Sequence, residues 1–368
     1  MKIIYLAPSL DPHDGYSRYS LDVISRMALL QEVVVICHKK SNCLPSVKEY
    51  EALRPAHHYF SNPLVLILDI FKLRKILKEE IKDENTILHF IAEGYAMFLP
   101  FLAGLKFKSV MTIHGTYSVL PLKNWKTAWL YKQVYKKLDR VIAVSNFTKK
   151  HLLKHVGYFI PENKVRVMTN GVDFIEHPLL DKKNDKICTI ISAGEVKNRK
   201  GAHHLVRVAK ILKDKFNLNF MVYIVGKFDE NSGYFKNLRK YIDGNNLDGK
   251  IKFTGQVLQE ELNEYYKKAN IFALLSVNEN FHYEGYPLVF HEAAMWRIPT
   301  IGSFNCGAED AIADGHSGVL VDPYGHDKIA QVMFDIFTDK IKIDPEECKK
   351  WAADNDWDKK DLLQMYKF

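Results

Sequence analysis

Short runs of apolar, mostly β-branched residues alternate with longer helical patterns along the chain. In the first half these runs predict strands at residues 2–7, 33–37, 86–91, 109–113, 140–144 and 165–168. In the second half they predict strands at residues 187–192, 219–225, 250–254, 271–275, 300–303 and 318–321. Strands with nearly continuous apolar faces, separated by helices, are typical of a parallel sheet covered on both sides. The pattern therefore predicts an α/β fold in which one plan occurs twice.

The stretch between the two series of predicted strands has the composition of a domain boundary. Residues 170–185 contain an Asn-Gly pair, a His-Pro pair and the charged run DKKND, and we place a hinge there. We expect a first domain of residues 1–170 and a second of residues 171–349, with a helix at about 350–368 packing back on the first. The expected architecture is two doubly wound, Rossmann-like domains facing across a cleft, with ligands at the carboxyl ends of the strands.

The composition fits two soluble domains, and the charge distinguishes them. The chain has 368 residues, of which 47% are hydrophobic and 26% charged. Residues 1–170 hold 25 of the 52 Lys and Arg residues but only 14 of the 44 Asp and Glu residues, which gives this part a net charge of +11. The rest of the chain then has a net charge of −3. This asymmetry indicates that the first domain meets an anionic surface or substrate. A solvated basic face is the alternative.

Neither the cysteines nor the apolar runs indicate secretion or a membrane-spanning helix. The five cysteines have no zinc-ligand spacing, which predicts a reducing compartment and no structural metal. The N-terminal apolar run ends within a few residues at Pro8, so it indicates a first strand rather than a secretion signal. The apolar runs at 63–68 and 96–105 fall below the roughly 18 residues that a spanning helix needs. We therefore expect a cytoplasmic protein.

Two glutamates follow the predicted strand at 271–275. Glu284 lies in the loop, and Glu292 comes eight positions later. Pro287 suits the first turn of a helix, so residues 288–296 are predicted to be helical, with Glu292 in the second turn and phosphate-binding N–H groups at the start. The two carboxylates would lie on the order of 10 Å apart, which suits opposite ends of one ligand. Two solvated glutamates beside a helix are the alternative.

A cationic turn follows the first strand of the second domain. Arg199, Lys200 and Gly201 stand where that strand gives way to an amphipathic helix. Two cations beside a glycine can hold a diphosphate through charge-assisted hydrogen bonds, with the glycine allowing close backbone approach. An ordinary helix start with exposed basic residues is the alternative. After the first strand of the chain Gly15 stands alone, without G-x-G-x-x-G, so no dinucleotide cofactor is expected.

Together these segments resemble a known family. The runs GEVKNRKG, GQV and EGYPLVFHEA, the CGAED turn and NGVD at the boundary are similar to landmarks of the GT-B fold retaining glycosyltransferases of family 4, the glycosyl transferases group 1. The first domain adds residues 1–15, TIHG and RVIAVS, so the resemblance covers nearly the whole chain. It implies a GT-B fold, a nucleotide-sugar donor and transfer with retention at the anomeric carbon.

The resemblance implies donor-binding roles in the second domain. Glu284 would meet hydroxyls of the donor sugar, and Glu292 would meet the ribose. Lys200, with Arg199, would bind the diphosphate, and backbone near Val257 would meet the nucleobase. The rest of the EGYPL segment is expected to line the donor site through Gly285, Tyr286 and Leu288.

In the first domain the resemblance points to two residues. Gly15 would let the first loop approach the diphosphate, and His114, after the strand at 109–113, would lie beside the transferred sugar. A lone histidine after a strand is more often part of the packing, which is the alternative for His114. The expected catalytic residues are therefore His114, Glu284 and Lys200.

Two positions depart from the family pattern. Glu195 stands where the family commonly has an arginine, and a carboxylate there cannot bind diphosphate, so Arg199 or another cation must assist Lys200. Pro287 stands where the family has a glycine, and it removes one backbone N–H that the sugar could meet. These departures bear on the affinity for the donor and on its identity.

Two charged stretches bear on metals and partners. The acidic residues of 354–358 imitate a D-x-D metal motif but follow no strand, so no metal is expected. Between Lys123 and Arg140 basic residues alternate with Trp and Tyr, which favours an interfacial helix at an anionic membrane over a nucleic-acid site. Each Lys near such a membrane contributes on the order of 1 kcal/mol in a salt-sensitive way. A plain surface helix is the alternative.

These observations predict a metal-independent, hexosyltransferase-like enzyme. It would move a sugar from a UDP- or GDP-linked donor to a glycan or lipid-linked acceptor, in the synthesis of a cell-surface polysaccharide or glycoconjugate. It would lie in the cytoplasm, peripherally on the inner face of the membrane. A nucleotide-sugar epimerase of the same fold, or a non-catalytic sugar-binding scaffold, are the alternatives.

Overall fold

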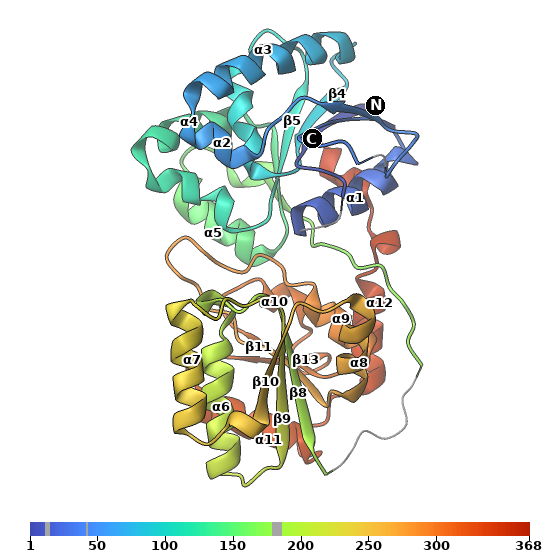
Figure 1. The fold of residues 1–368 in the computed structure, drawn as a ribbon. Coiled ribbons are helices and arrows are strands. Elements are labelled where there is room, and N and C mark those ends of the chain that lie inside the picture. The colour runs from blue at the N-terminus through green and yellow to red at the C-terminus, as the bar shows by residue number, and fades with distance from the viewer. Residues whose placement is uncertain (12–14, 42, 179–185) are drawn as a thin grey trace. The chain divides into compact units, whose positions relative to one another are not determined.

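The computed structural model describes residues 1–11, 15–41, 43–178 and 186–368, and these residues form two compact units. Unit 1 comprises Met1–Asn170 and Asp361–Phe368, and unit 2 comprises Gly171–Lys360 (Figure 1). The chain therefore leaves unit 1 after Asn170 and returns to it after Lys360. The DKKND run of the predicted hinge, residues 181–185, lies outside the described residues.

A parallel sheet forms the centre of unit 1. Among the described residues it has seven strands, in the order β3-β2-β1-β4-β5-β6-β7. The strands are β1 (Lys2–Ala7), β2 (Glu32–Cys37), β3 (Lys48–Glu51), β4 (Thr86–Phe90), β5 (Lys108–Ile113), β6 (Arg140–Ala143) and β7 (Val165–Val167). β1 pairs in parallel with both β2 and β4, so that Ile3 lies opposite Val33 and Ile87. The strand order reverses between β1 and β4, which makes their carboxyl ends the switch point where ligands bind in such sheets.

Helices connect these strands, and polar side chains cap several of them. The α-helices of unit 1 are α1 (Gly15–Ala28), α2 (Ala56–Ser61), α3 (Pro63–Glu80), α4 (Trp125–Lys137) and α5 (Asn146–Val156), and the longest 3₁₀ helix is η1 (Glu93–Phe101). The side-chain oxygens of Asn62, Asn124 and Ser145 accept backbone N–H groups at the starts of α3, α4 and α5. These caps satisfy N–H groups that a helix leaves unpaired at its first turn.

The edge strand β3 is absent from the sequence-based prediction. Its four residues, KEYE, are polar or half-buried, because an edge strand buries little of its surface. Glu80, at the end of α3, fixes the strand by accepting hydrogen bonds from Lys48 Nζ at 2.7 Å and Tyr50 Oη at 2.5 Å. Lys2 Nζ on β1 lies 2.6 Å from the same carboxylate. Burial raises the pKa of Glu80, but these hydrogen bonds outweigh burial and lower the pKa to about 2.

Unit 2 has a second parallel sheet. Among the described residues it has six strands, in the order β10-β9-β8-β11-β12-β13, and its order reverses between β8 and β11. The strands are β8 (Cys188–Ala193), β9 (Phe220–Val225), β10 (Ile251–Gly255), β11 (Ile271–Leu274), β12 (Thr300–Ser303) and β13 (Gly318–Val321). The helices are α6 (Ala202–Asp214), α7 (Gly233–Gly244), α8 (Gln259–Lys268), α9 (Val289–Met295), α10 (Ala308–Ala311), α11 (His326–Phe337) and α12 (Pro345–Asp354).

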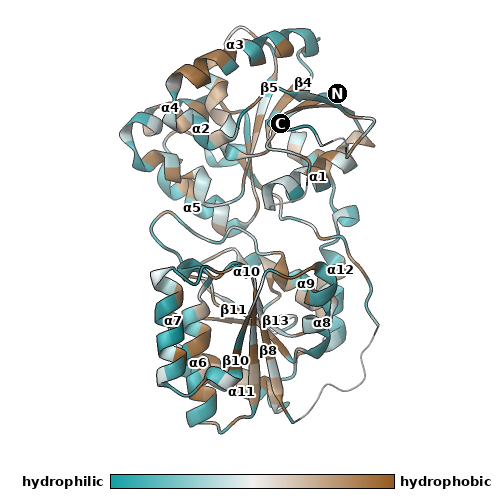
Figure 2. Ribbon diagram, in the orientation of Figure 1, coloured by the Kyte–Doolittle hydropathy of each residue, from teal (hydrophilic) through white to brown (hydrophobic). Residues whose placement is uncertain are grey.

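The cores explain why the apolar runs become strands. Apolar side chains of the sheet and of α6 and α11 form a buried core in unit 2, with Ile190, Val208 and Ile329 fully enclosed. Figure 2 shows the same contrast, with hydrophobic strands inside and hydrophilic outer faces on helices such as α6 and α7. The predicted α/β fold with two doubly wound sheets is therefore confirmed.

The C-terminal segment divides between the two units, unlike the expected helix at 350–368. α12 ends at Asp354, and residues up to Lys360 belong to unit 2, where Cys348 and Ala352 pack beside α9. Residues 361–368 belong to unit 1. There the Tyr366 hydroxyl hydrogen-bonds to Tyr5 Oη at 2.6 Å and to His89 Nδ1 at 2.8 Å. The break follows from the capping oxygens of Asp356 and Asp361, which start two short 3₁₀ turns after α12.

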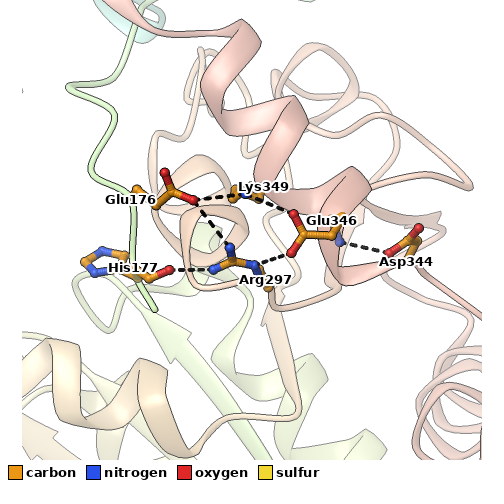
Figure 3. Close-up of polar contacts among 6 residues, drawn as sticks. All are labelled: Glu176, His177, Arg297, Asp344, Glu346 and Lys349. Atoms are coloured by element: carbon orange, nitrogen blue, oxygen red, sulfur yellow. Dashed lines mark hydrogen bonds and ion pairs between the residues drawn. The ribbon is translucent and has the colours of Figure 1, made fainter. Parts of the chain in front are cut away.

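The start of the predicted hinge is held against unit 2. Figure 3 shows Arg297, after α9, donating to the carbonyl of His177 at 2.6 Å and pairing with Glu346 of α12 at 2.6 Å. Lys349 pairs with Glu346 at 2.9 Å and with Glu176 at 3.0 Å. Residues 171–178 therefore belong to unit 2, where Arg297 and Lys349 of α12 hold Glu176 and His177.

Candidate functional site

Three charged side chains of unit 2 meet where the strand order reverses. Lys200 Nζ lies 2.6 Å from Glu284 Oε2, and Arg199 Nη1 lies 2.9 Å from the same oxygen. Lys200 and Arg199 follow β8, whereas Glu284 follows β11, the neighbouring strand. The structure thus brings together residues that the sequence assigns to one ligand. Their roles in donor binding and catalysis stay predictions.

Gly201 shapes the turn that presents these cations. It has a left-handed φ of +74°, and a Cβ there would lie 1.7 Å from the carbonyl oxygen of Leu275. The N–H of Val277 donates to the carbonyl of Arg199 at 2.8 Å, which ties the turn to the end of β11. The sequence analysis attributes the glycine to close approach of a ligand. The structure adds a second reason: packing against Leu275, just after β11, by itself requires glycine, and the approach of a ligand stays a prediction.

The cluster carries two positive charges for one negative charge. Burial raises the pKa of Glu284, but the charges of Lys200 and Arg199 outweigh burial and hold that pKa below its usual range. Glu284 is therefore ionised at neutral pH. The side chains of Lys200 and Arg199 are 18% and 29% exposed, so both cations remain accessible to a ligand. This arrangement suits an anion that offers several oxygens.

Glu292 lies at the start of α9 and has a different partner. The helix begins at Val289, so Glu292 stands in its first turn rather than in the second. The difference arises because Pro287 precedes the capping residue Leu288 instead of occupying the first helical turn. The buried hydroxyl of Tyr266, from α8, donates to Glu292 Oε2 at 3.2 Å. The separation of about 10 Å between the two glutamates stays a prediction.

The backbone of the EGYP segment is fixed by a second glycine. A Cβ at Gly307, in the CGAED turn, would lie 1.8 Å from the carbonyl oxygen of Gly285, and the Gly307 N–H donates to the carbonyl of Glu284 at 2.8 Å. Tyr286 Oη hydrogen-bonds to His291 Nε2 at 2.7 Å. Burial lowers the pKa of His291 to about 3, so this pair is neutral. The segment is therefore rigidly positioned from both sides.

Three further predicted positions lie around this segment. Leu288 packs against a small apolar cluster that contains Val172 and Ala294. Val257 is half-buried in the loop between β10 and α8. Glu195, which departs from the family pattern, is exposed and pairs with Lys197 Nζ at 2.8 Å. Lys197 therefore offsets the charge of the carboxylate at that position.

In unit 1, His114 follows β5 and is held by two hydrogen bonds. The backbone N–H of His114 donates to Glu93 Oε1 at 2.6 Å, and Nε2 of its imidazole ring donates to the carbonyl of Ile91 at 2.9 Å. The rings of Tyr16 and Tyr19 contact the imidazole edge-on at centroid distances of 4.8 and 4.5 Å. Burial lowers the pKa of His114, although Glu93 and the Ile91 carbonyl oppose it. The neutral ring therefore carries its lone pair on Nδ1.

The sequence analysis finds Gly15 but misses Glu93. Gly15 begins α1, and a Cβ there would meet no atom within 4 Å, so packing among the described residues does not require a glycine. Glu93 follows β4 and is fully buried, with its Oε1 accepting from His114. The sequence signal that could have found Glu93 is an acidic residue soon after a buried strand. Only the topology shows that this strand, β4, lies where the strand order of the sheet reverses.

The acidic residues of 354–358 have local structural roles. Asp356 accepts backbone N–H groups from Asp358 at 2.7 Å and from Phe174 at 3.0 Å, and Asp354 pairs with Lys359 at 2.9 Å. Within the described ranges, no group of three or more His, Cys, Asp or Glu side chains is placed to hold a metal ion.

The basic and aromatic stretch between Lys123 and Arg140 has two faces. On α4 the side chains of Trp125 and Trp129 are 79% and 63% exposed, whereas Tyr131 and Tyr135 are buried. Of these four aromatic side chains, the two tyrosines therefore belong to the core and the two tryptophans lie at the surface. In the part of the chain that the structure describes, no helix has the length and apolar character to cross a membrane.

Two family models match consecutive parts of the chain. The model described as Glycosyltransferase Family 4 matches residues 13–175, and the model described as Glycosyl transferases group 1 matches residues 175–355. Together they extend over both units, and they agree with the resemblance drawn from the motifs.

Individual proteins show the same relationship. The chain is 24% identical over 274 residues to an uncharacterized 41.2 kDa protein of the cps region of Klebsiella pneumoniae, covering 71% of this chain and 70% of the relative. It is 24% identical over 252 residues to a Campylobacter jejuni α-1,4-N-acetyl-D-galactosaminyltransferase that acts on a PP-undecaprenol-linked glycan, covering 68% and 64%. Its fold matches the crystal structure of Anabaena HepE with UDP-glucose at a TM-score of 0.73 and 16% identity, covering 100% and 98%.

Proposed function

Because the chain belongs to the glycosyltransferase family 4, with its group 1 domain and GT-B fold, we propose that it transfers a sugar from a nucleotide sugar to a glycan or lipid-linked acceptor. The donor is UDP- or GDP-linked, and the anomeric configuration is retained. The product belongs to a cell-surface polysaccharide or glycoconjugate. The observation that supports this proposal most is the cluster of Lys200, Arg199 and Glu284 at the switch point of unit 2.

The cluster suggests how the donor is held. In the free protein, Lys200 and Arg199 share one oxygen of Glu284. When a donor binds, its diphosphate oxygens become the partners of the two cations, and the released Glu284 carboxylate accepts hydrogen bonds from sugar hydroxyls. The negative charge on the leaving diphosphate grows as the sugar–oxygen bond breaks, so Lys200 and Arg199 stabilise the transition state more than the ground state. These two cations take the role that a metal has elsewhere, and no metal is required.

Other proposed contacts complete the donor site. Glu292, at the start of α9, meets the ribose, and the backbone near Val257 meets the base. Gly285, Tyr286 and Leu288 line the sugar side. From unit 1, Gly15 leaves space at the start of α1, and His114 offers Nδ1 as an acceptor for the transferred sugar.

We also propose that unit 1 attaches to an anionic membrane surface. Four apolar side chains on one face of α3, at helical spacing, are exposed to solvent: Leu64 (71%), Ile67 (48%), Leu68 (62%) and Phe71 (69%). Figure 2 shows the hydrophobic colouring along this helix. Exposed lysines follow on the same helix, and the exposed Trp125 and Trp129 add interfacial aromatics on α4. Apolar side chains beside lysines are typical of helices that lie in a membrane surface.

The alternatives make different demands on the same residues. A nucleotide-sugar epimerase needs no second substrate, so release of nucleotide that depends on an acceptor excludes it. A non-catalytic scaffold binds without turnover. The cluster of Lys200, Arg199 and Glu284 suits chemistry at a diphosphate, which a non-catalytic scaffold does not need.

Substitution of Lys200 tests the proposal. UDP, GDP and ADP are each added to the wild type and to Lys200→Ala, and thermal unfolding and sugar transfer are measured. One nucleotide should stabilise the wild type by about 2.7 kcal/mol at 100 times its Kd. Lys200→Ala should keep the fold but lower transfer at least tenfold. Lys210→Ala, at a partly exposed lysine of α6 that pairs with Asp214, serves as the control. Unchanged turnover in Lys200→Ala, or no stabilisation by any nucleotide, contradicts the proposal.

A further inference from the structure

A line of buried polar side chains crosses the interior of unit 1. Tyr5 on β1, His89 on β4 and Thr112 on β5 are fully enclosed, in strands that are otherwise mostly apolar. Tyr19 of α1 and Tyr366 of the C-terminal segment are 4% and 6% exposed. Apolar side chains at both ends of a buried hydrogen bond can be equally stable, so the packing of the sheet does not by itself explain these five polar groups.

The register of the sheet places three of these side chains on one face. Tyr5 lies directly opposite His89 in the pairing of β1 with β4. His89 lies opposite Val110 in the pairing of β4 with β5, and Thr112 comes two residues after Val110. Side chains alternate between the two faces of a strand, so Thr112 shares the face of His89. His114 follows two residues after Thr112, just beyond the end of β5.

Hydrogen bonds join the five side chains into one chain with His89 at its centre. Nδ1 of His89 lies 2.8 Å from the Tyr366 hydroxyl, which lies 2.6 Å from the Tyr5 hydroxyl. Nε2 of His89 lies 2.8 Å from Thr112 Oγ1, and Thr112 also hydrogen-bonds to the hydroxyl of Tyr19. Both ring nitrogens of His89 are therefore used, one toward the C-terminal segment and the other toward β5 and α1.

The imidazole of His89 couples the two halves of this chain. Burial, with a smaller contribution from nearby His114, lowers the pKa of His89 to about 3, so the ring is neutral and has one N–H. One ring nitrogen must then donate and the other must accept, so the hydroxyls of Tyr366 and Thr112 have opposite roles toward the ring. The direction of the hydrogen bond on one side thus fixes the direction on the other, and a change at Tyr366 reaches Thr112.

Tyr19 brings the chain of hydrogen bonds to His114. The ring of Tyr19 contacts the imidazole of His114 edge-on, at a centroid distance of 4.5 Å. Nε2 of His114 is bound to the carbonyl of Ile91, so the freedom that remains to the ring is rotation about this hydrogen bond. The contact with Tyr19 limits that rotation, and with it the direction of Nδ1.

The C-terminal segment is anchored at the other end of the chain of hydrogen bonds. Arg140, at the start of β6, donates from Nη1 to the carbonyl of Lys367. Arg166, on β7, donates to the carbonyl of Gln364 at 3.3 Å. These two bonds hold the backbone on both sides of Tyr366, so its hydroxyl has a defined position beside β4.

Building on the proposed function, we infer that His89 is a positioning residue, which links the docking of the C-terminal segment to the orientation of the His114 ring. Tyr366 carries the link on one side of His89, and Thr112 and Tyr19 carry it on the other. His89 is fully buried, so it acts through its neighbours rather than on a substrate. Residues that follow unit 2 in the sequence thereby complete the support of a proposed catalytic residue of unit 1.

NMR of the histidine rings tests this link without an acceptor. The full chain is prepared with isotope-labelled histidine, and the ring signals of His114 are identified by their loss in His114→Gln. Tyr366→Phe and Thr112→Val each remove one hydroxyl and nearly keep the shape of the side chain. Both should shift the His114 signals, because the ring of Tyr19 moves relative to the imidazole. Thr112→Ser, which keeps the hydroxyl, should leave the signals at the wild-type position.

Kinetics separate positioning from folding. Tyr366→Phe and Thr112→Val should lower kcat for sugar transfer about tenfold, because a reacting group misplaced by ~1 Å can cost ~10²-fold, and should leave KM for the nucleotide sugar unchanged. Thr112→Ser should restore kcat. Tyr50→Phe is the matched control: it removes a hydroxyl that donates to Glu80 from the edge strand β3 of the same sheet. It should lower the melting temperature of unit 1 and leave kcat and the His114 signals unchanged.

The outcomes distinguish this inference from the proposed function. The inference is overturned if Tyr366→Phe leaves the His114 signals or kcat as in the wild type, if Thr112→Ser behaves like Thr112→Val, or if Tyr50→Phe gives the same changes. None of these results affects nucleotide binding or the effect of Lys200→Ala. Shifted His114 signals in a protein that neither binds nucleotide nor transfers sugar would instead contradict the proposed function and leave the link from His89 to His114 in place.

Discussion

At the scale of single residues, one carboxylate oxygen organises the unit 2 site. Glu284 Oε2 contacts Lys200 and Arg199 together, whereas Glu292 accepts a hydrogen bond from the hydroxyl of Tyr266. Glu284 is therefore coupled to the two cations that we propose to hold the diphosphate. The partner that we propose for Glu292 is the uncharged ribose.

This difference predicts that alanine substitutions of the two glutamates affect different steps, nucleotide binding in one case and sugar transfer in the other. Glu292→Ala should mainly weaken nucleotide binding, because a ribose contact is the same in the ground and transition states. Glu284→Ala should lower transfer even when nucleotide is saturating. Calorimetric titration and steady-state kinetics measure the two effects, with Glu260→Ala, an exposed residue of α8, as the control. If both variants bind nucleotide as the wild type does, the ribose role of Glu292 is wrong.

At the scale of elements, α3 is apolar on two sides. Leu73 and Leu77 are fully buried and anchor the helix to unit 1, while Leu68 and Phe71 are 62% and 69% exposed. The exposed face is not needed for the packing of the helix, because the buried face already provides it. An exposed apolar surface of this kind is typical of a site that contacts a protein or a membrane.

Charged residues on that face should therefore abolish membrane attachment without unfolding the protein. The variant Leu68→Glu/Phe71→Glu should no longer sediment with anionic liposomes at low salt, whereas the wild type should sediment there and less so at high salt or with neutral liposomes. Leu29→Glu, at an 85% exposed leucine of the same unit, is the control. Equal recovery of the wild type in the supernatant under every condition would reject peripheral attachment.

At the scale of the whole molecule, the chain returns to unit 1 for its last eight residues. Tyr366 is only 6% exposed and joins β1 to β4 through Tyr5 and His89. Phe368 lies under the charged ends of Lys108 and Arg140, at 4.3 and 5.0 Å from the ring centre. The C-terminal residues therefore contribute to the stability of unit 1 although they follow unit 2 in the sequence.

Removal of the Tyr366 side chain should lower the stability of unit 1 only. Tyr366→Ala should destabilise unit 1 by about 3 kcal/mol, as for other large buried aromatic side chains. Calorimetry should then show the transition of unit 1 at a lower temperature, while nucleotide still raises the transition of unit 2. Tyr158→Ala, at a 97% exposed tyrosine of unit 1, is the control. A uniform shift of both transitions would show that the two units do not unfold separately.

The sequence alone determined the order of the elements and the cationic turn. Buried strands of parallel sheets are apolar nearly throughout, so β1, β12 and β13 are predicted with the bounds that the structure has. Lys200, Arg199 and Glu284 are also recognisable, because each follows a predicted strand at the edge where ligands bind. The edge strand β3 escapes this logic, since its polar residues are stabilised by Glu80 from a distant helix.

Only the tertiary structure decided which groups pair and which remain unpaired. Glu93 looks like any other acidic residue in the sequence, and its significance comes from backbone N–H groups of a loop more than twenty residues later and from an oxygen that none of the described residues reaches. Likewise, Gly201 and Gly307 are required by carbonyl groups of segments distant in sequence. Local patterns report burial and helix or strand preference, whereas hydrogen-bond satisfaction depends on contacts that form only when the sheet assembles.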